Sequence, residues 1–256
     1  MSANPMCSQD FKSPSPSLAS LSIVIPARNE EQFLPKCLEA IKAASHGVQV
    51  PIEVVVVLNR CTDRTAEIAK EFGCTVVEAG GKNLSHIRNS GVRAARGEMI
   101  ITIDADSVMS PNMLTAVLEE LSSGKNVGGG VLIKPERYSL GILMSGLMLL
   151  PVALYHRISA GLFFFRKDDF NAIGGFDEKL FSAEDIDFAK RLRAHGKATG
   201  RKYRHLLKAH ITTSCRKFDR FGDWHFVLRP WLFWRLLKGK DQAAANQVWY
   251  DFNDRS

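Results

Sequence analysis

The region from residue 21 to residue 103 alternates short β-branched apolar runs with stretches of helical spacing, and this alternation restricts the fold more than any other feature. Four apolar runs are predicted to be strands: residues 22–26, 52–58, 74–79 and 98–103. Between the first two runs, apolar residues recur at helical spacing: Leu34, Cys37, Leu38 and Ile41. Strands that alternate with covering helices form βαβ units. The sequence therefore predicts a Rossmann-like α/β fold, with a mixed, mostly parallel sheet flanked by helices.

Length and composition agree with a single globular domain. A chain of 256 residues can bury one large core. Hydrophobic residues make up 45% and charged residues 24%, which excludes a disordered or fibrous chain. The five cysteines form no CxxC pair, and the N-terminus lacks the apolar run of a secretion signal, so we expect a cytoplasmic location. Residues 1–20, rich in serine and proline, are expected to form a disordered tail.

Positive charge gathers towards the C-terminus. The formal net charge is +7, and residues 201–240 hold eleven Lys or Arg against only Asp219 and Asp223. Nucleic acid, anionic lipid or a phosphate-bearing substrate would each suit such a region. Charge alone does not choose among these three partners.

Two apolar stretches raise the question of a membrane. Residues 140–155 carry no charge, but the run is short for a membrane span and contains Pro151. Such a run favours a buried helix over a helix that touches a membrane or lines an acceptor site. Residues 226–240 mix Trp231 and Trp234 with arginine and lysine. This composition suits either a peripheral helix on an anionic bilayer or a helix docked on the domain.

Polar clusters follow three of the four predicted strands. Residues 26–30 read PARNE, residues 59–63 read NRCTD, and residues 104–106 read DAD. In open sheets of this type, ligands bind beyond the carboxyl ends of the strands. Asp104 and Asp106 would repel each other at the end of a buried strand unless a cation compensates them. A divalent cation, Mn²⁺ or Mg²⁺, with positions left for phosphate oxygens suits them, and an Asp pair that forms a turn is the plain alternative.

Four segments, in register, resemble the family 2 glycosyltransferases of the GT-A fold. These segments are SIVIPARNEE, VVLNRCTDRT, ARGEMIITIDADSVMSP and GLFFFRKDDFNAIGGFDEKLFSAEDIDFAKRLRAHG. The resemblance implies a GT-A type domain over residues 21–200. It also implies a metal-dependent, inverting transfer of a sugar from a nucleotide diphosphate to a hydroxyl acceptor, such as a lipid or glycan. Residues 201–256, where the resemblance weakens, are expected to form a lid and a docking or membrane-surface helix.

The resemblance implies a donor site built from strand-end residues: Pro26, Ala27, Arg28, Glu30, Asn59, Asp104 and Ala105. The first two would lie against the base and ribose, and Glu30 would accept the ribose hydroxyls. The family pattern usually has two acidic residues where this chain has Leu58 and Asn59. An Asn carbonyl still accepts from the ring N–H of uracil, so a UDP sugar is slightly favoured and a GDP sugar stays open. Asp177, in the GGFDE loop, is a candidate contact to a sugar hydroxyl.

Three basic residues are candidates for binding the diphosphate. The resemblance places Arg88 on a helix that approaches the diphosphate, where a guanidinium matches phosphate geometry. A solvated Arg on a surface helix is the alternative at this position. Arg216 and Lys217 come late enough in the chain to fold back over the phosphates and balance their charge.

The resemblance also implies metal ligands and a catalytic base. Asp106 would bind the metal with Asp104 beside it, and the metal would act as a Lewis acid on the departing diphosphate. His210 is a candidate third ligand, although a lone His is more often structural. Glu184 and Asp185 begin a helical segment, where carboxylates also favour the helix dipole. In the family, the Asp of this pair is the general base, which implies Asp185 as base and Glu184 as its support.

Other classes of protein remain as alternatives. A non-catalytic scaffold that binds sugar nucleotides or a membrane could share the fold, but it would have no need of the three aspartates Asp104, Asp106 and Asp185. No nucleic-acid-binding motif accompanies the basic C-terminal region, so no nucleic acid partner is expected. A nucleotidyltransferase would need a glycine-rich phosphate loop after the first strand, and PARNE is not one.

Overall fold

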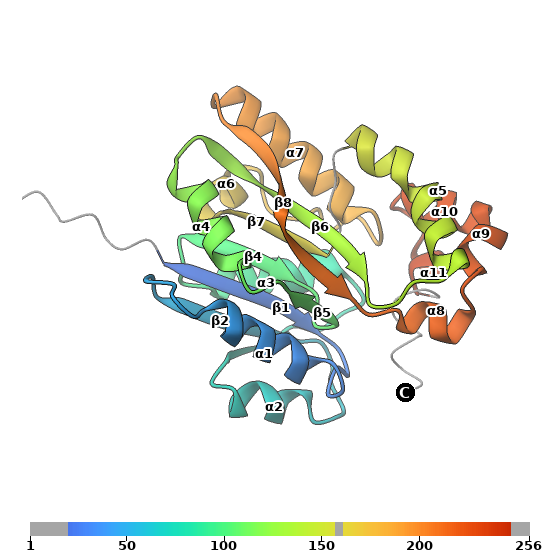
Figure 1. Cartoon of the computed structure of the whole chain (residues 1–256), viewed down its shortest axis with the longest axis horizontal. Helices are drawn as coiled ribbons and strands as arrows, with labels where there is room; N and C mark the ends of the chain where they lie inside the picture. Colours follow the sequence, from blue (N-terminus) through green and yellow to red (C-terminus); the bar gives the residue numbers. More distant parts are fainter. Residues whose placement is uncertain (1–19, 157–160, 247–256) are drawn as a thin grey trace, which may run out of the picture.

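The first four strands form one half of a single twisted sheet. The computed structural model describes residues 20–156 and 161–246, so the predicted tail lies almost wholly outside the described residues (Figure 1). The four strands predicted from the sequence are all present: β1 (Leu21–Ala27), β2 (Ile52–Leu58), β3 (Thr75–Glu78) and β4 (Met99–Ile103). Neighbouring strands among them run parallel, as βαβ units require.

Four further strands complete the sheet, whose order in the described part of the chain is β3-β2-β1-β4-β7-β6-β8-β5. The added strands are β5 (Ser107–Met109), β6 (Asn126–Pro135), β7 (Leu162–Arg166) and β8 (Lys202–Thr213). β7 is antiparallel to both β4 and β6, whereas β8 is parallel to β6. The predicted α/β fold with a mixed, mostly parallel sheet is confirmed. Because β8 belongs to the sheet, the sheet continues past residue 200, the predicted domain boundary.

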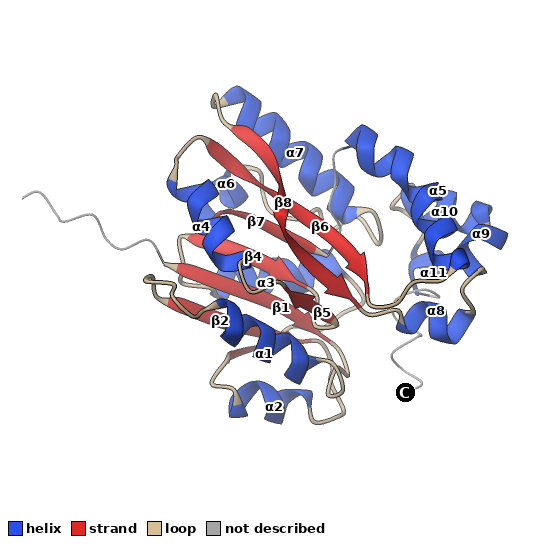
Figure 2. Cartoon of the chain, in the orientation of Figure 1, coloured by secondary structure: helices blue, strands red, loops and turns tan. Residues whose placement is uncertain are grey.

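Helices cover both faces of the sheet (Figure 2). One face packs against α1 (Leu34–Ala44), α2 (Thr65–Glu71) and α4 (Met113–Ser122). The other face packs against α3 (Leu84–Ala94), α6 (Lys167–Ala172) and α7 (Glu184–Ala198). Every residue of β4 is buried as a result. Burial on both faces explains why this strand is a continuous apolar run rather than an alternating one.

Helix α3 is positioned closely on the sheet, and its first turn has a side-chain cap. Asn83 accepts a hydrogen bond from the backbone N–H of His86 at 2.9 Å, which satisfies one of the donors left over at a helix start. Gly91 faces Val24 and Val57, and a Cβ at this position would clash with both side chains. The close approach of α3 to β1 and β2 brings Arg88, one turn earlier, to the edge of the sheet.

The remaining helices gather at one end of the sheet (Figure 1). They are α5 (Leu140–His156), α8 (Arg216–Phe221), α9 (His225–Leu228), α10 (Pro230–Leu237) and α11 (Gln242–Ala245). The prediction that residues 140–155 form a buried helix is wrong in one respect. The helix forms, but Leu140 is 65% exposed and Leu147 57% exposed. Among the described residues, no helix has both the length and the apolar character needed to cross a bilayer.

Candidate functional site

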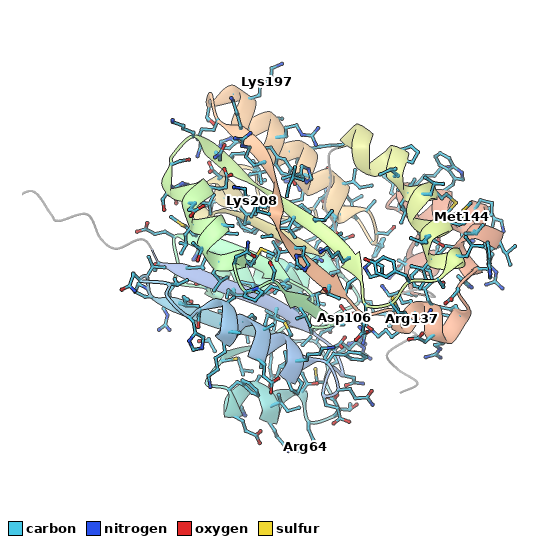
Figure 3. The ribbon with its side chains drawn as sticks, viewed as in Figure 1. Arg64, Asp106, Arg137, Met144, Lys197 and Lys208 are labelled. Carbon is cyan, nitrogen blue, oxygen red and sulfur yellow. The ribbon has the colours of Figure 1, made fainter. Side chains whose placement is uncertain are left out.

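The candidate residues meet where the carboxyl ends of β1 and β4 face the C-terminal helices (Figure 3). Asp104 and Asp106 follow β4 in a tight turn, in which the N–H of Ser107 donates to the carbonyl of Asp104 at 3.0 Å. Ala105, between them, is buried. The turn presents Asp104 to Arg88 of α3 and Asp106 to Arg216 of α8.

Arg88 lies almost fully buried against three carboxylates. Its Nη2 donates to Asp104 Oδ1 at 3.0 Å, while its Nη1 donates to Asp185 Oδ1 at 2.6 Å and to Glu184 Oε1 at 3.2 Å. The Phe176 ring lies 5.4 Å from its guanidinium carbon. Burial alone would lower the pKa of Arg88, but the three carboxylates outweigh burial and raise it. With 2% of its surface exposed, Arg88 is not the solvated surface arginine of the alternative interpretation.

Arg216 forms a second cluster on the other side of the Asp104–Asp106 turn. Its Nη1 and Nη2 donate to the two oxygens of Glu30, each at 2.8 Å. Its Nε lies 3.1 Å from Asp106 Oδ2. The Phe33 ring lies 4.9 Å from the guanidinium carbon, within the range of a cation–π contact. Burial would lower the pKa of Arg216, but Asp106 and Glu30 raise it above its ordinary value.

Burial gives the carboxyl groups of this region unusual proton affinities. It raises the pKa of Glu30 to about 7, although the charge of Arg216 opposes the shift. It also raises the pKa of Glu184 to about 7, and the neighbouring Asp185 adds to this shift. The pKa of Asp185 is likewise raised by burial against the opposing charge of Arg88. Glu30 and Glu184 therefore bind and release protons near neutral pH.

Asp106 and Lys217 share the same environment. Burial raises the pKa of Asp106, while Arg216 opposes the shift. Burial lowers the pKa of Lys217, and the carboxylate of Asp106 opposes that shift. Lys217 therefore lies where its charge acts on the Asp104–Asp106 turn, and its binding to a diphosphate stays a prediction.

The loops after β1 and β2 are held together by candidate donor-binding residues. Arg28 Nη1 donates to the carbonyl of Asn59 at 3.1 Å. Asn59 is buried, and its Oδ1 accepts from Arg60 Nε at 3.3 Å. Ala27 is buried at the end of β1, directly after Pro26. In this arrangement Oδ1 of Asn59, the side-chain oxygen that was expected to face a base, is turned towards Arg60.

Two other predicted residues make no hydrogen bond to the Asp104–Asp106 turn among the contacts described. The N–H of His210, on β8, donates to Ser110 Oγ at 3.1 Å, whereas the N–H of Ser214 donates to the carbonyl of Asp106 at 3.1 Å. Because three residues of an extended strand lie between His210 and Ser214, the structure does not bring His210 to Asp106. The side chain of Asp177 accepts from the N–H of Lys179 at 2.9 Å, within its own turn.

Other residues of the site were not found from the sequence. The hydroxyl of Thr65 accepts from the N–H of Glu30 at 2.8 Å and fixes the loop after β1. The carbonyl of Gly161 accepts from the N–H of Asp104 at 3.2 Å and fixes the loop after β4. Phe33 and Phe176 lie against the two guanidinium groups. The position of Phe33, two residues after the PARNEE segment, was the one signal that could have identified it.

The carboxylates of the turn suit a hard cation, but they do not complete a metal site. Within the described ranges, no group of three His, Cys, Asp or Glu side chains converges to hold a metal ion. Mg²⁺ in proteins commonly takes one or two carboxylates and completes its coordination with substrate phosphates and water. Asp104 and Asp106 fit a divalent cation of this kind, provided that a bound ligand supplies further oxygens.

The space beside Asp106 is small. A hollow of about 30 Å³ is lined there by Phe33, Asp106 and Ser214, among other residues. A larger hollow, of about 330 Å³, lies against α1 and β2, and none of the candidate site residues lines it. Ligand pockets usually measure at least several hundred Å³. The larger hollow reaches this size but lies away from the candidate site, whereas the hollow beside Asp106 is too small for a nucleotide.

Comparison with known proteins shows the family. The sequence profile of Glycosyl transferase family 2 matches residues 22–170. This chain belongs to glycosyl transferase family 2. The matched segment holds both arginine-facing aspartates of the turn and Arg88, but it ends before Asp185 and Arg216.

Curated relatives of this family 2 chain cover parts of it. The low-salt glycan biosynthesis hexosyltransferase Agl6 of Haloferax volcanii is 38% identical over 105 residues, 41% of this chain and 25% of the relative. The undecaprenyl-phosphate 4-deoxy-4-formamido-L-arabinose transferase of Pseudomonas paraeruginosa is 33% identical over 119 residues, 43% of this chain and 35% of the relative. This chain therefore matches only a quarter to about a third of the length of these two proteins.

A solved structure shows the same fold over most of the chain. Glucosyl-3-phosphoglycerate synthase from Mycobacterium tuberculosis, in complex with Mn²⁺, UDP and phosphoglyceric acid, superposes with a TM-score of 0.56. It is 17% identical, and the match covers 89% of this chain and 78% of that chain. Likeness at this level of identity identifies the GT-A type fold.

Proposed function

We propose that this family 2 chain is a metal-dependent, inverting glycosyltransferase that moves a sugar from a nucleoside diphosphate to a hydroxyl acceptor. One observation carries the proposal: a single guanidinium, that of Arg88, holds both Asp104 and Asp185. The carboxylate expected near the diphosphate and the carboxylate expected to take a proton are thereby held by two different nitrogen atoms of one guanidinium. Transfer with inversion needs groups of these two kinds on opposite sides of the reacting carbon.

Donor binding begins with the loops after β1 and β4. Glu30 is proposed to accept the ribose hydroxyls, with Pro26, Ala27 and Asn59 beside the base. Since Arg216 now occupies both Glu30 and Asp106, the donor must displace these contacts. The displaced guanidinium and Lys217 are then available for the diphosphate, which needs positive charge. The hollow beside Asp106, of about 30 Å³, is too small for a nucleotide as it stands, which agrees with such an exchange of contacts.

Asp106 and Asp104 are the residues proposed to hold a divalent cation, Mn²⁺ or Mg²⁺, together with the phosphate oxygens. When bound, the cation supplies Lewis-acid stabilisation of the negative charge on the departing diphosphate. The presence of Mn²⁺ and UDP in the M. tuberculosis synthase structure supports this choice. A UDP sugar is slightly favoured as donor, and a GDP sugar is the second candidate.

Asp185 is proposed as the general base, with Glu184 as its support. As the acceptor oxygen attacks the anomeric carbon, the hydroxyl proton passes to an Asp185 carboxylate oxygen. Arg88 keeps Asp185 oriented through the 2.6 Å hydrogen bond and partly offsets the effect of burial on its pKa. Because burial leaves the pKa of Asp185 above its ordinary value, its carboxylate is a stronger proton acceptor than an exposed aspartate.

The acceptor is proposed to be a lipid or a glycan hydroxyl, reached at the cytoplasmic side. The names of the Haloferax and Pseudomonas relatives, which point to a glycan pathway and to a lipid phosphate, support these two classes. Asp177 is proposed to contact a sugar hydroxyl once its loop meets a ligand. A non-catalytic scaffold of the same fold is the alternative.

Release of nucleoside diphosphate from a panel of UDP and GDP sugars tests the proposal. The assay contains Mn²⁺ and an acceptor panel of oligosaccharides and a polyprenyl phosphate. Asp185→Asn is expected to lower turnover on a hydroxyl acceptor by about 10²- to 10⁴-fold, because the general base is lost. A phosphate acceptor is already ionised near pH 7, so the same variant should then lose much less activity.

Asp187→Asn is the matched control for this experiment. Asp187 lies on the same helix and is paired with Arg191 at 2.7 Å. It should keep wild-type turnover. Turnover on a hydroxyl acceptor that is equal in wild type and Asp185→Asn would contradict the assignment of the base.

A further inference from the structure

Helix α5 is apolar on nearly all of its surface, yet only a narrow stripe of it is covered. Gly141, Ile142 and Ser145 are the buried residues among those whose side chains are described. Large apolar side chains are exposed on the rest of the helix: Leu140, Leu143, Met144, Leu147, Leu149 and Leu150. An isolated exposed leucine needs no explanation, but a helix with this many exposed apolar side chains does.

Helices α9 and α10 extend this apolar area. Leu228 is 74% exposed, Trp231 54% and Trp234 63%, while Leu232 and Leu236 of α10 point inward and are buried. Because α5 contacts α9 and α9 contacts α10, the exposed side chains belong to one continuous group of helices. We call the exposed apolar side chains of α5, α9 and α10 the α5–α10 surface; Figure 3 shows Met144 on it.

Basic side chains border the α5–α10 surface. Arg229 precedes α10, and Lys238 and Lys240 follow it, all three exposed. Neither α5 nor α10 contains an acidic residue. The carboxylates near these helices along the chain are paired: Glu136 with Lys36 at 3.2 Å, Asp223 with Arg137 at 2.7 Å and Asp241 with Arg235 at 2.6 Å. The border of the surface is therefore positively charged.

We infer that the α5–α10 surface docks on an anionic lipid bilayer. Leucines enter the acyl boundary, tryptophans suit the headgroup depth, and arginine and lysine at the border attract lipid phosphates. In this arrangement the helices of the surface lie along one face of the membrane. A second copy of this chain is the less suitable occupant, because a symmetric contact would bring Arg229, Lys238 and Lys240 close to their own copies.

Ion pairs connect the α5–α10 surface to the candidate site. Arg137, in the loop before α5, pairs with Asp219 of α8 and with Asp223, which follows α8. A Cβ on Gly141 would lie 2.6 Å from the carbonyl of Asp223, so the start of α5 sits directly on this segment. Docking therefore places the bilayer beside the helix that begins with Arg216. The docking inference does not rest on glycosyl transfer, since binding to lipid is measured without any donor or acceptor.

Tryptophan fluorescence of the full chain tests the inference. All four tryptophans of the sequence lie between residues 224 and 249, so their emission reports on the C-terminal region. The probes are vesicles of phosphatidylcholine alone and vesicles that also contain phosphatidylglycerol. We expect a blue shift of the emission and cosedimentation with the anionic vesicles, both weakened by added salt.

Paired variants distinguish docking through the α5–α10 surface from nonspecific binding of the chain to vesicles. Leu147→Gln with Met144→Gln should lower vesicle affinity at least about tenfold, because apolar contact with the acyl boundary is lost. Arg229→Gln and Lys238→Gln should each lower it about fivefold. Leu207→Gln and Lys197→Gln are the controls, an 80% exposed leucine of β8 and an exposed lysine at the far end of α7 (Figure 3). Both controls should bind vesicles as the wild type does.

Three results would overturn the inference. The first is no binding of the folded wild type to anionic vesicles. The second is binding that the α5 double variant and the control variants reduce equally. The third is a stable dimer in sedimentation that Leu147→Gln dissociates, with no vesicle binding, which would assign the surface to a second copy of the chain.

Discussion

Arg88 and Arg216 set the electrostatics of the candidate site, because each one compensates carboxylates that the fold has buried. Arg88 faces Asp104, Glu184 and Asp185, and Arg216 faces Glu30 and Asp106. Five carboxylates thus meet two guanidinium groups, with Lys217 nearby. Buried charges of one sign that lack full compensation shift towards the neutral form. This excess of carboxylate groups is consistent with the raised pKa values and with the proposed binding of a cation.

The two raised glutamate pKa values predict how stability depends on pH. In the folded chain Glu30 and Glu184 have pKa values of about 7, against an ordinary value of 4.5. Between these values the folded chain holds protons that the unfolded chain has released. The two glutamates therefore contribute their full stabilisation below about pH 4.5, and this contribution is lost as pH rises through about 7. The free energy of unfolding falls by up to about 1.4 kcal/mol per pH unit for each group.

Urea denaturation between pH 5 and pH 8 measures this dependence. Glu184→Gln should reduce the fall in the free energy of unfolding across this range, since the glutamine side chain does not titrate. Glu119→Gln, an exposed residue of α4, should keep the wild-type slope. An identical slope in wild type and Glu184→Gln would show that Glu184 is not responsible.

Sequence reasoning found residues within motifs but not most partners that are distant in sequence. Asp104, Asp106, Arg88 and Asp185 stand in recognisable segments, and the structure brings them together. The pairing of Arg216 with Glu30 joins residues 186 positions apart. No local pattern records such a contact, because it depends on where β8 returns the chain.

At the level of single elements, glycines in β6 allow two strands to approach closely. Gly129 pairs with Arg204 of β8 and with Phe164 of β7. A Cβ on Gly129 would clash with the backbone carbonyl of Arg204, which a rotamer change cannot relieve. The segment NVGGGVLI contains these glycines, but its sequence did not show that three neighbouring backbones meet there.

Gly129→Ala should therefore destabilise the fold by about 2 to 3 kcal/mol, as expected for overpacking against a fixed backbone. Gly146→Ala is the matched control, because Gly146 lies in α5 with no atom within 4 Å of the added Cβ. This control should gain about 0.5 to 1 kcal/mol from helix propensity. Unfolding free energies from urea titration decide the matter, and equal effects of the two substitutions would contradict the packing account.

Elements with a clear period were predictable, and those without one were not. The strands β1 to β4 and the helices between them follow continuous apolar runs and helical spacing. β8 mixes lysine, arginine and histidine with apolar residues, so its sequence carries no strand signal. Helix α5 was expected to be buried because it lacks charge. Both faces of the sheet are already covered by other helices, which leaves α5 at the periphery.

For the whole molecule, the sheet and the C-terminal helices form two connected parts. The loops that follow β1 and β4 supply Glu30, Asp104 and Asp106. Helix α8 supplies Arg216 and Lys217, and α5, α9 and α10 form the α5–α10 surface. Arg137 joins them through its pairs with Asp219 and Asp223. Events at a membrane and events at the candidate donor site would therefore act on the same helix, α8. Charge bias suggested the importance of this region from the sequence, but only the fold shows that its Arg216 contacts Glu30 and Asp106.

Titration calorimetry of UDP and GDP, with and without Mn²⁺, tests the central claim most directly. The wild type should bind one nucleotide in the presence of Mn²⁺, and Asp106→Asn should weaken this binding at least about tenfold, since a cation–phosphate contact is lost. Asp168→Asn, an exposed aspartate on α6, should bind as the wild type does. Equal, Mn²⁺-independent binding by wild type and Asp106→Asn, or no binding by the folded wild type, would contradict the account.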